Sequence, residues 1–297
     1  MTATLLLVDA YAMIYRAFYA IRHLTGPAGE PVNAIYGCTK MLRKYLAEHR
    51  PTHCAVVFDL GPPRQRLAIL PSYKAQRPPT PPDLTAQLPA IREILRALRL
   101  PVVERDGDEA DDIIATLAKR TARAGQSVLI VSNDKDFAQL VDDQIRLLRS
   151  GTKTDQVYDT PAVQTKYGVL PTQIVDLFSL IGDSVDNIPG VPGVGEKTAT
   201  ALLQQFQNLD QLLAHPAEIA SPKLRATLIQ SADRLRLNRQ LIQLDQTVEV
   251  AADWSDLRIQ PPDYPALVAA LQQHGFQSLL KEIEHESRQG ADLFTGF

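Results

Sequence analysis

Three short apolar runs, each followed directly by acidic residues, limit most strongly what this chain can form. Residues 5–8 lead into Asp9, residues 55–58 into Asp59, and residues 128–131 into a polar turn that ends at Asp134. Helical periodicity over 10–23, 33–49, 84–98 and 108–124 separates these strand-like runs. The alternation predicts an α/β fold with a mostly parallel central sheet and helices on both faces.

The apolar runs stop near residue 170, and only helical patterns follow. We therefore predict an α/β domain over 1–170, a helical lobe over 171–285 and a flexible tail over 286–297. Residues 61–82 contain seven prolines and cannot form an uninterrupted helix.

Acidic residues gather where ligands bind in a parallel sheet, beyond the carboxyl ends of the strands. Nine carboxylates are candidates for metal ligands: Asp9, Asp59, Glu109, Asp111, Asp112, Asp134, Asp136, Asp183 and Asp186. Within this set, Glu109 and Asp112 share one face of a helix through their i,i+3 spacing. So many acids repel one another unless cations lie between them, which favours a pair of divalent metals and phosphodiester hydrolysis. The alternative is that single acids are helix caps or turn residues.

A glycine-rich segment, residues 187–199, is the second strong signal. Gly190, Gly193 and Gly195 precede Lys197 at the predicted start of a helix. Glycines at a helix N-terminus let backbone N–H groups approach a phosphate, and the lysine adds a charge-assisted contact. The segment predicts a helix-hairpin-helix element that grips a nucleic-acid backbone, with an ordinary turn between helices as the alternative.

The overall composition decides little. The formal charge is -3, and two bound divalent cations would bring it to +1, so net charge neither supports nor excludes nucleic acid. No apolar run approaches the roughly 20 residues of a membrane helix, and we expect no membrane partner. Cys38 and Cys54 predict neither a disulfide framework nor a zinc site. We expect a cytoplasmic, nucleoid-associated protein.

Several motifs occur in a fixed order along the chain. They are Asp9 with Tyr15-Arg16-Ala17-Phe18, Phe58-Asp59, Tyr73-Lys74-Ala75-Gln76-Arg77, Glu109-Ala110-Asp111-Asp112, Asp134-Lys135-Asp136, Gly182-Asp183-Ser184-Val185-Asp186-Asn187 and the glycine-rich segment. Together they resemble the 5′–3′ exonuclease domain of bacterial DNA polymerase I, within the flap endonuclease family. The resemblance runs from about residue 4 to about 282. The chain is either a stand-alone nuclease or a domain taken from a longer polymerase.

The resemblance implies a role for each matching residue. Asp9, Asp59, Glu109, Asp111 and Asp112 would surround one metal, while Asp134, Asp136, Asp183 and Asp186 would serve a second. The implied metals are two Mg²⁺ ions, for which Mn²⁺ would substitute, and the hairpin is implied to bind K⁺. Arg16 and Lys74 would contact the scissile phosphate, and Tyr73 would stack on a terminal base. The resemblance also implies that the region 62–92 is an arch through which the 5′ strand passes, and that the helical lobe 171–285 binds DNA. Arg77 would lie on this arch. Solvated loop residues are the alternative for Tyr73, Lys74 and Arg77.

The predicted function is a structure-specific 5′–3′ exonuclease and 5′-flap endonuclease, acting on branched, flapped or nicked DNA and on RNA primer strands in replication and repair. Asp134 is expected to be essential for cleavage. Two rival functions remain: a related single-strand ribonuclease, which would not need the glycine-rich hairpin, and a non-catalytic binder of branched DNA.

The C-terminal segment 289–294 resembles the short peptides that dock on the bacterial sliding clamp. Gln289 would begin this peptide, and Leu293 and Phe294 would fill an apolar pocket on the clamp. Tethering would raise the effective concentration of the nuclease at its substrate. A linker remnant, or a tail that folds back on the core, is the alternative.

Overall fold

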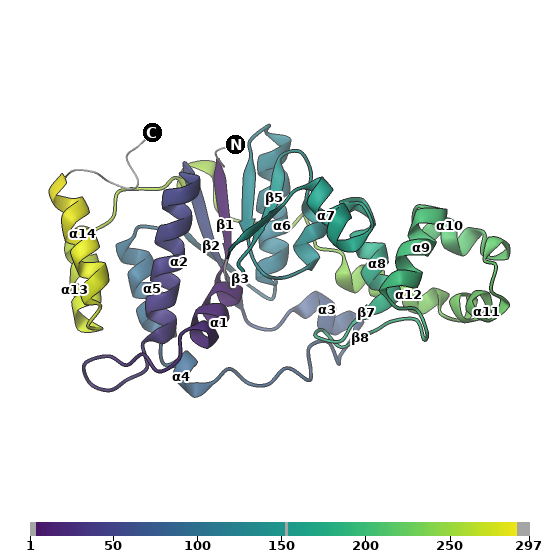
Figure 1. Ribbon diagram of the computed structural model, residues 1–297, viewed down its shortest axis with the longest axis horizontal. Helices are drawn as coiled ribbons and strands as arrows, with labels where there is room; N and C mark the ends of the chain where they lie inside the picture. The colour runs from purple at the N-terminus through teal and green to yellow at the C-terminus, as the bar shows by residue number, and fades with distance from the viewer. Residues whose placement is uncertain (1–3, 152–153, 290–297) are drawn as a thin grey trace.

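A computed structural model describes residues 4–151 and 154–289. Its sheet contains the parallel strands β1 (Leu5–Asp9), β2 (His53–Leu60), β3 (Val102–Asp106), β4 (Val128–Val131) and β5 (Ile145–Arg149), with β6 (Gln156–Tyr158) antiparallel at one edge. The strand order is β3-β2-β1-β4-β5-β6 (Figure 1). The predicted, mostly parallel sheet is confirmed, and β1 lies between β2 and β4.

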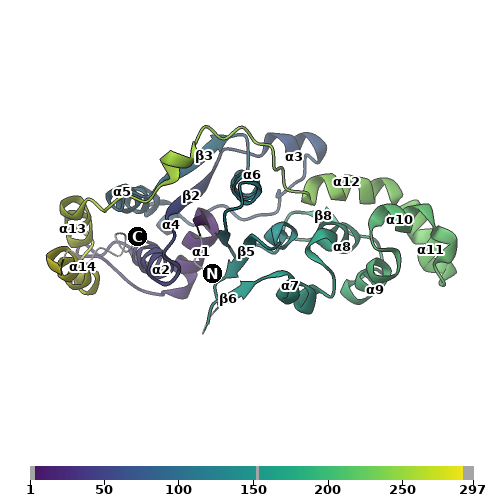
Figure 2. The ribbon, with the colours of Figure 1, turned by 90° about the horizontal axis from the view of Figure 1, so that it is seen from above.

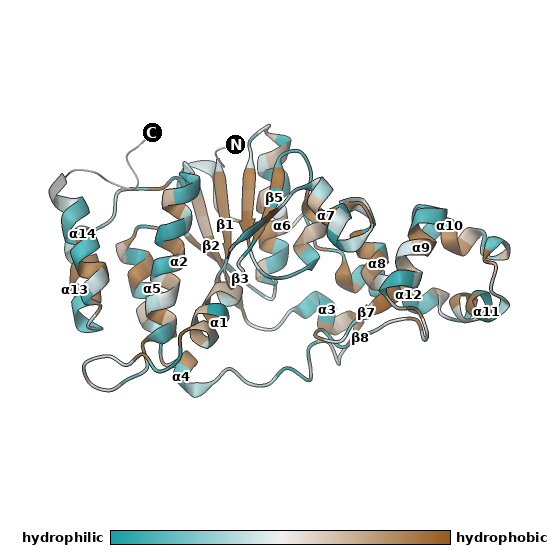
Figure 3. Cartoon of the chain, viewed as in Figure 1, coloured by the Kyte–Doolittle hydropathy of each residue, from teal (hydrophilic) through white to brown (hydrophobic). Residues whose placement is uncertain are grey.

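Alternating residues of β1 point to opposite faces of the sheet. Leu5 and Leu7 join the core under α6 (Ala110–Arg123). Leu6 and Val8 join the core under α1 (Ala10–Ala20), α2 (Asn33–His49) and α5 (Leu88–Ala97). Helices therefore cover both faces, as predicted, and the inner strands β1, β2 and β4 are largely apolar between them (Figure 3).

The proline-rich region contains two short helices, α3 (Arg64–Ile69) and α4 (Pro82–Thr85), joined by the non-helical segment 70–81. This segment runs along the lower side of the molecule in the view of Figure 1, between α3 and α4. The expectation that prolines interrupt a helix here is met, because proline lacks the amide donor that a helix interior requires. From Leu88 onward the predicted arch region already belongs to α5, whose Ile91 is buried in the core.

The helical lobe extends from one side of the sheet. It contains α7 (Thr160–Tyr167), η2 (Pro171–Gln173), α8 (Ile174–Ile181), the short strands β7 (Gly182–Asp183) and β8 (Ile188–Pro189), α9 (Glu196–Phe206), α10 (Leu209–Ala214), η3 (Pro216–Glu218), α11 (Pro222–Gln230) and α12 (Ala232–Ile242). The core under α6 and the turn η1 (Asp136–Leu140) continues into this lobe through buried residues such as Phe206 and Leu235. The lobe is thus built onto the sheet without a break in the apolar core.

The last two helices lie at the opposite end of the molecule from α9–α11 (Figure 2). After α12 the chain crosses the sheet edge through η4 (Trp254–Leu257) to α13 (Tyr264–Gln273) and α14 (Gln277–Gln289). Leu267 and Phe276 pack in the core with α2 and α5, and Arg43 pairs with Glu286 at 2.6 Å. This differs from the predicted lobe over 171–285 and from a flexible tail that begins at 286. Helical periodicity shows that a helix has an apolar face but does not show which partner covers it.

The clamp-docking prediction falls mostly outside the described residues. Gln289 is the last residue of α14, and nothing is described of its side chain, while Leu293 and Phe294 lie beyond the described range. Within residues 4–151 and 154–289, none of the helices combines the length and apolar character that crossing a bilayer would require.

Candidate active site

The carboxyl ends of three neighbouring strands bring distant acids to one edge of the sheet. Asp9 ends β1, Asp59 lies near the end of β2, and Asp134 follows β4. A cavity of about 390 Å³ opens at this edge. Its lining comprises Asp9, Tyr11, Ala12, Tyr15, Asp59, Lys74, Arg77, Asp111, Asn133, Asp134, Lys135, Arg149, Asp183, Val185 and Asp186. Six of the nine predicted acids therefore line one cavity, together with Lys74 and Arg77.

Four of these acids, Asp9, Asp59, Asp111 and Asp134, are called the strand-edge acids below. Their carboxylates are held mainly by backbone N–H groups and a hydroxyl. Asp9 accepts from the Ala12 amide at 3.0 Å and from the Ser132 hydroxyl at 2.7 Å. Asp59 accepts from the Ala110 amide at 2.8 Å. Among the described residues, no lysine or arginine forms an ion pair with any of the four.

Burial without a cation changes the protonation of the strand-edge acids. Desolvation raises the pKa of Asp9 to about 6, and hydrogen bonds to the carboxylate only partly oppose this. Burial likewise raises the pKa of Asp59, Asp111 and Asp134, and the charge on Asp134 adds to the effect at Asp111. A buried acid with a raised pKa is one whose negative charge lacks compensation, and a bound cation would provide it.

The second group, called the hairpin-side acids, consists of Asp136, Asp183 and Asp186. One carboxylate oxygen from each lies within 4.8 Å of the others. Asp183 ends β7, Asp186 lies in the β7–β8 turn, and Asp136 begins η1. The Oδ1 atom of Asp136 is buried and has no hydrogen-bond partner among the described residues. A hard divalent cation, which prefers carboxylate oxygens, fits this donor set.

Cationic side chains already contact two of the hairpin-side acids. Lys135 pairs with Asp183, and Arg77 pairs with Asp186 at 2.6 Å. The Tyr73 hydroxyl donates to Asp186 at 3.0 Å. This side of the cavity therefore carries its own positive charge, in contrast to the strand-edge acids.

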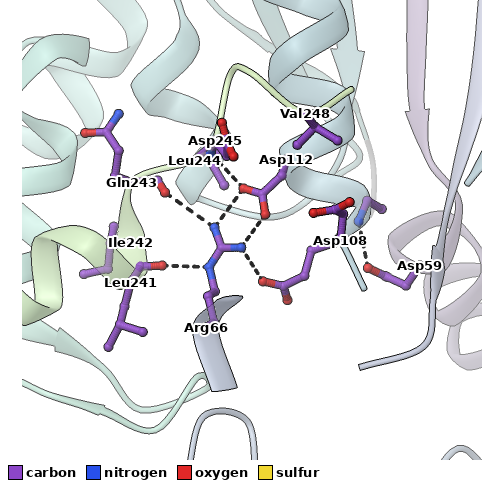
Figure 4. A network of polar contacts seen from close by, with 12 residues as sticks. Asp59, Arg66, Asp108, Asp112, Leu241, Ile242, Gln243, Leu244, Asp245 and Val248 are labelled. Atoms are coloured by element: carbon purple, nitrogen blue, oxygen red, sulfur yellow. Dashed lines mark hydrogen bonds and ion pairs between the residues drawn. The ribbon is translucent and has the colours of Figure 1, made fainter. Parts of the chain in front are cut away.

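Glu109 and Asp112 do not line the cavity. Both contact the Arg66 guanidinium, Glu109 at 2.7 Å, and Arg66 donates to both oxygens of Asp112 (Figure 4). Glu109 also pairs with Lys74. The predicted i,i+3 relation of the two acids describes this shared face. Asp111 lies on another face of α6 and reaches the cavity, so the three acids of one motif divide between two environments.

The predicted phosphate and base contacts occupy different surroundings. Arg16 on α1 donates to the Gly151 carbonyl and does not line the cavity. Tyr73 is 5% exposed, with its hydroxyl between Asp186 and Glu109. Stacking of Tyr73 on a terminal base stays a prediction, and it requires the ring to leave this buried position.

The glycine-rich segment connects the β7–β8 hairpin to α9. Gly190 lies so close to the end of α8 that a Cβ atom would stand 2.0 Å from the Ile181 carbonyl oxygen. Gly193 has a φ of 78°, a conformation that favours glycine. Gly195 precedes the first turn of α9, and Lys197 is exposed in that turn. The backbone at the start of α9 is thus open to solvent beside a lysine.

Several cavity-lining residues were absent from the sequence-based prediction. Lys135 lies between two predicted acids, so adjacency alone could have pointed to it. Arg149 ends β5 and donates to the Asn133 carbonyl at 2.9 Å. Arg149 could have been predicted from its position at the carboxyl end of a strand, which is the feature that pointed to Asp9 and Asp59. The Oδ1 atom of Asn133, another lining residue, is buried without a partner in the described part of the chain.

Two family models match consecutive parts of the chain. Residues 4–168 match the N-terminal resolvase-like domain of 5′–3′ exonucleases, and residues 169–265 match the C-terminal domain of the same enzymes, which has a SAM fold. The chain therefore belongs to the 5′–3′ exonuclease family. The predicted resemblance is confirmed.

The relatives include proteins about three times as long as this chain and a protein of similar length. DNA polymerase I of Bacillus caldotenax is 43% identical over 97% of this chain, which spans 33% of that protein. A 5′–3′ exonuclease of Aquifex aeolicus is 36% identical over 97% of the chain and 98% of its own length. Among solved structures, the bacteriophage T5 D15 flap endonuclease in a pseudo-enzyme-product complex with DNA and metal ions has a TM-score of 0.69. Its sequence is 21% identical, and the match covers 95% of this chain and 98% of that one.

Proposed function

We propose that this chain is a divalent-metal-dependent 5′ nuclease that hydrolyses phosphodiester bonds in flapped or nicked DNA. The observation that carries the proposal is the convergence of six acids in one cavity, with the buried, unpartnered Asp136 oxygen beside them. The T5 relative in complex with DNA and metal ions supports the same assignment. Neutral or cationic side chains would serve a simple phosphate-binding pocket better than these acids do.

The strand-edge acids would hold one Mg²⁺ or Mn²⁺ ion and the hairpin-side acids a second. Glu109, which the sequence predicted as a metal ligand, would act on the site through its ion pair with Lys74, a residue that lines the cavity. Two bound ions would supply an activated water and offset charge on the leaving oxygen. Lys74 and Arg77 already line the cavity, where they would bind the non-bridging oxygens of the substrate phosphate and stabilise the charge that develops there.

The helical lobe would hold the duplex part of the substrate. The exposed backbone at Gly193 and Gly195, with Lys197 beside it, is suited to a phosphate of the DNA backbone and would not read base sequence. We propose that this segment is a helix-hairpin-helix element with a K⁺ ion at its backbone carbonyls. The whole-protein context of the polymerase relatives supports a role in primer and flap removal, and docking of residues 289–294 on a sliding clamp remains part of the proposal.

Cleavage of a 5′-labelled flapped duplex tests the proposal. The wild-type protein should release short 5′ products in Mg²⁺ and none in EDTA. Asp134→Asn should lower the cleavage rate by about 10²–10³-fold or more, because it removes a charge that would hold a metal in the cavity. Asp106→Asn is the matched control: Asp106 also ends a strand of this sheet, but it is exposed and pairs with Arg64 outside the cavity.

Two further substrates separate the rival functions. Single-stranded RNA cut faster than flapped DNA would favour the ribonuclease alternative. Tight binding of flapped DNA without hydrolysis in either Mg²⁺ or Mn²⁺ would favour the non-catalytic binder and end the nuclease proposal.

A further inference from the structure

The Arg66 guanidinium on α3 is buried, at 7% exposure, and all three of its nitrogens donate hydrogen bonds. Nε donates to the Leu241 carbonyl at 2.9 Å, and Nη2 donates to Asp112 at 2.9 Å. Nη1 contacts both Asp112 and Glu109 (Figure 4). A planar guanidinium can satisfy several acceptors in fixed directions at once, which a lysine ammonium at the same place cannot do.

The backbone that Arg66 contacts at Leu241, near the end of α12, continues as the non-helical segment 243–248. Three side chains from two other elements, α6 and η1, satisfy this backbone. Asp112 accepts from the Asp245 amide at 2.8 Å, Thr116 from the Val248 amide at 3.1 Å, and Gln139 from the Leu244 amide at 3.0 Å. Because buried backbone groups need partners, these contacts fix where α12 ends relative to α6.

Both oxygens of Asp112 are therefore used away from the cavity. Oδ1 accepts from Arg66 and from the Asp245 amide, and Oδ2 accepts from Arg66. Glu109 connects this network to the cavity without lining it. One of its oxygens contacts Arg66, and the other pairs with Lys74, which lines the cavity. A continuous series of contacts thus runs from the end of α12 through Arg66 and Glu109 to Lys74.

We propose that Arg66 is a positioning residue that sets Glu109 and Lys74 relative to the helical lobe, and that Asp112 is its counter-ion and not a direct metal ligand. This inference rests on the proposed nuclease function of the cavity. The foot of the 70–81 segment, the start of α6 and the end of α12 move as one unit because they share this guanidinium. A phosphate gripped by the lobe therefore meets Lys74 at a fixed separation.

Binding of Mn²⁺ to the DNA-free protein, measured by calorimetry, tests the role of Asp112. Asp112→Asn keeps an oxygen acceptor but loses charge. It should bind as many ions as the wild type, with an affinity within about 3-fold, and melt at a lower temperature because the charge of Arg66 is then only partly compensated. Asp134→Asn should lose one ion or bind it much more weakly. Loss of an ion in Asp112→Asn would overturn the inference.

Kinetics of Arg66→Lys test the positioning role. We expect a kcat lower by about 10²-fold, because small displacements of positioned groups are costly. Its affinity for flapped DNA in Ca²⁺ should stay within about 3-fold of wild type. The control is Arg64→Met on the same helix, where the arginine is exposed and pairs with Asp106, and it should leave both values within about 3-fold.

Equal kcat values in Arg66→Lys and Arg64→Met would refute the inference while leaving the nuclease function intact. A wild-type protein that binds no divalent ion and cuts no flap would instead refute the function itself. If Arg66→Lys fails to fold, the ion count of Asp112→Asn decides the question.

Discussion

The two groups of acids in the cavity are compensated in opposite ways. Asp9, Asp59 and Asp134 accept hydrogen bonds from backbone amides, and Asp9 also accepts one from the Ser132 hydroxyl. Among the described residues, the four strand-edge acids form no ion pair. On the hairpin side, Asp183 has Lys135 and Asp186 has Arg77. An incoming metal therefore meets uncompensated charge at the strand-edge acids, whereas at Asp183 and Asp186 it must compete with a side-chain cation.

The largest expected difference between the two groups is catalytic. Asp111→Asn should lower kcat for flap cleavage by about 10³-fold, because none of the described lysines or arginines forms an ion pair with the strand-edge acids that could offset a lost metal. Asp183→Asn should cost less, about 10-fold to 10²-fold, since Lys135 is freed and keeps a positive charge nearby. Single-turnover cleavage rates measure both. Equal losses in the two variants would remove the distinction between the groups.

Low pH should stabilise the metal-free protein, because it protonates Asp9, one of the strand-edge acids. The pKa of Asp9 is about 6 in the folded state and 3.8 without the fold. Its contribution to stability is therefore fully present below about pH 4 and is lost as the pH rises through about 6. The amount is about 3 kcal/mol.

Urea unfolding of wild type and Asp9→Asn in EDTA, from pH 4 to pH 7, isolates this contribution. The difference in unfolding free energy between the two proteins should change over that range. As the pH rises, the folded wild type releases a proton from Asp9, whereas the variant has no carboxyl group at this position. Saturating Mg²⁺ should weaken the pH dependence, since the ion takes the place of the proton. A constant difference across the range would show that Asp9 is already compensated in the folded protein.

The hairpin-side metal should bind more tightly when its internal competitor is removed. Lys135→Met keeps the length of the side chain and removes the charge that pairs with Asp183. We expect the Mn²⁺ ion at the hairpin-side acids to bind about 10-fold more tightly. In the variant the ion no longer has to displace the Lys135 ammonium from Asp183. Lys119→Met is the control, since Lys119 pairs with Asp142 at 2.7 Å outside the cavity. A weaker second ion in Lys135→Met would mean that this lysine assists loading.

The smallest expected effect lies outside both acid groups. Lys197→Ala should weaken binding of flapped DNA only a few-fold and lower the slope of affinity against salt by about one, because a single phosphate contact is lost. Anisotropy titrations at several salt concentrations give both values. An unchanged slope would place the duplex on another surface of the lobe.

Local signals made the sheet and the strand-edge acids predictable. A strand and the residue that follows it are adjacent in sequence, so Asp9, Asp59 and Asp134 could be assigned to one edge once a parallel sheet was inferred. Asp111 was found because it begins a helix beside other acids.

Contacts between distant segments were beyond prediction. Arg66 meets Leu241, which lies 175 residues further along the chain, and nothing in its local sequence distinguishes it from Arg64. The packing of α13 and α14 on α2 and α5 has the same origin. For the same reason Asp111 and Asp112 were grouped together, although consecutive helical residues face different directions and meet different partners.

The central position of β1 has a consequence for synthesis on the ribosome. The strands β1, β2 and β3 can pair as soon as residues up to 106 have emerged, but the other edge of β1 must wait for residues 128–131. Until then a half-built sheet presents an unpaired apolar strand to its surroundings, a state prone to wrong association. The nascent chain should depend most on chaperones during this interval, and slower translation between β3 and β4 would lengthen that dependence.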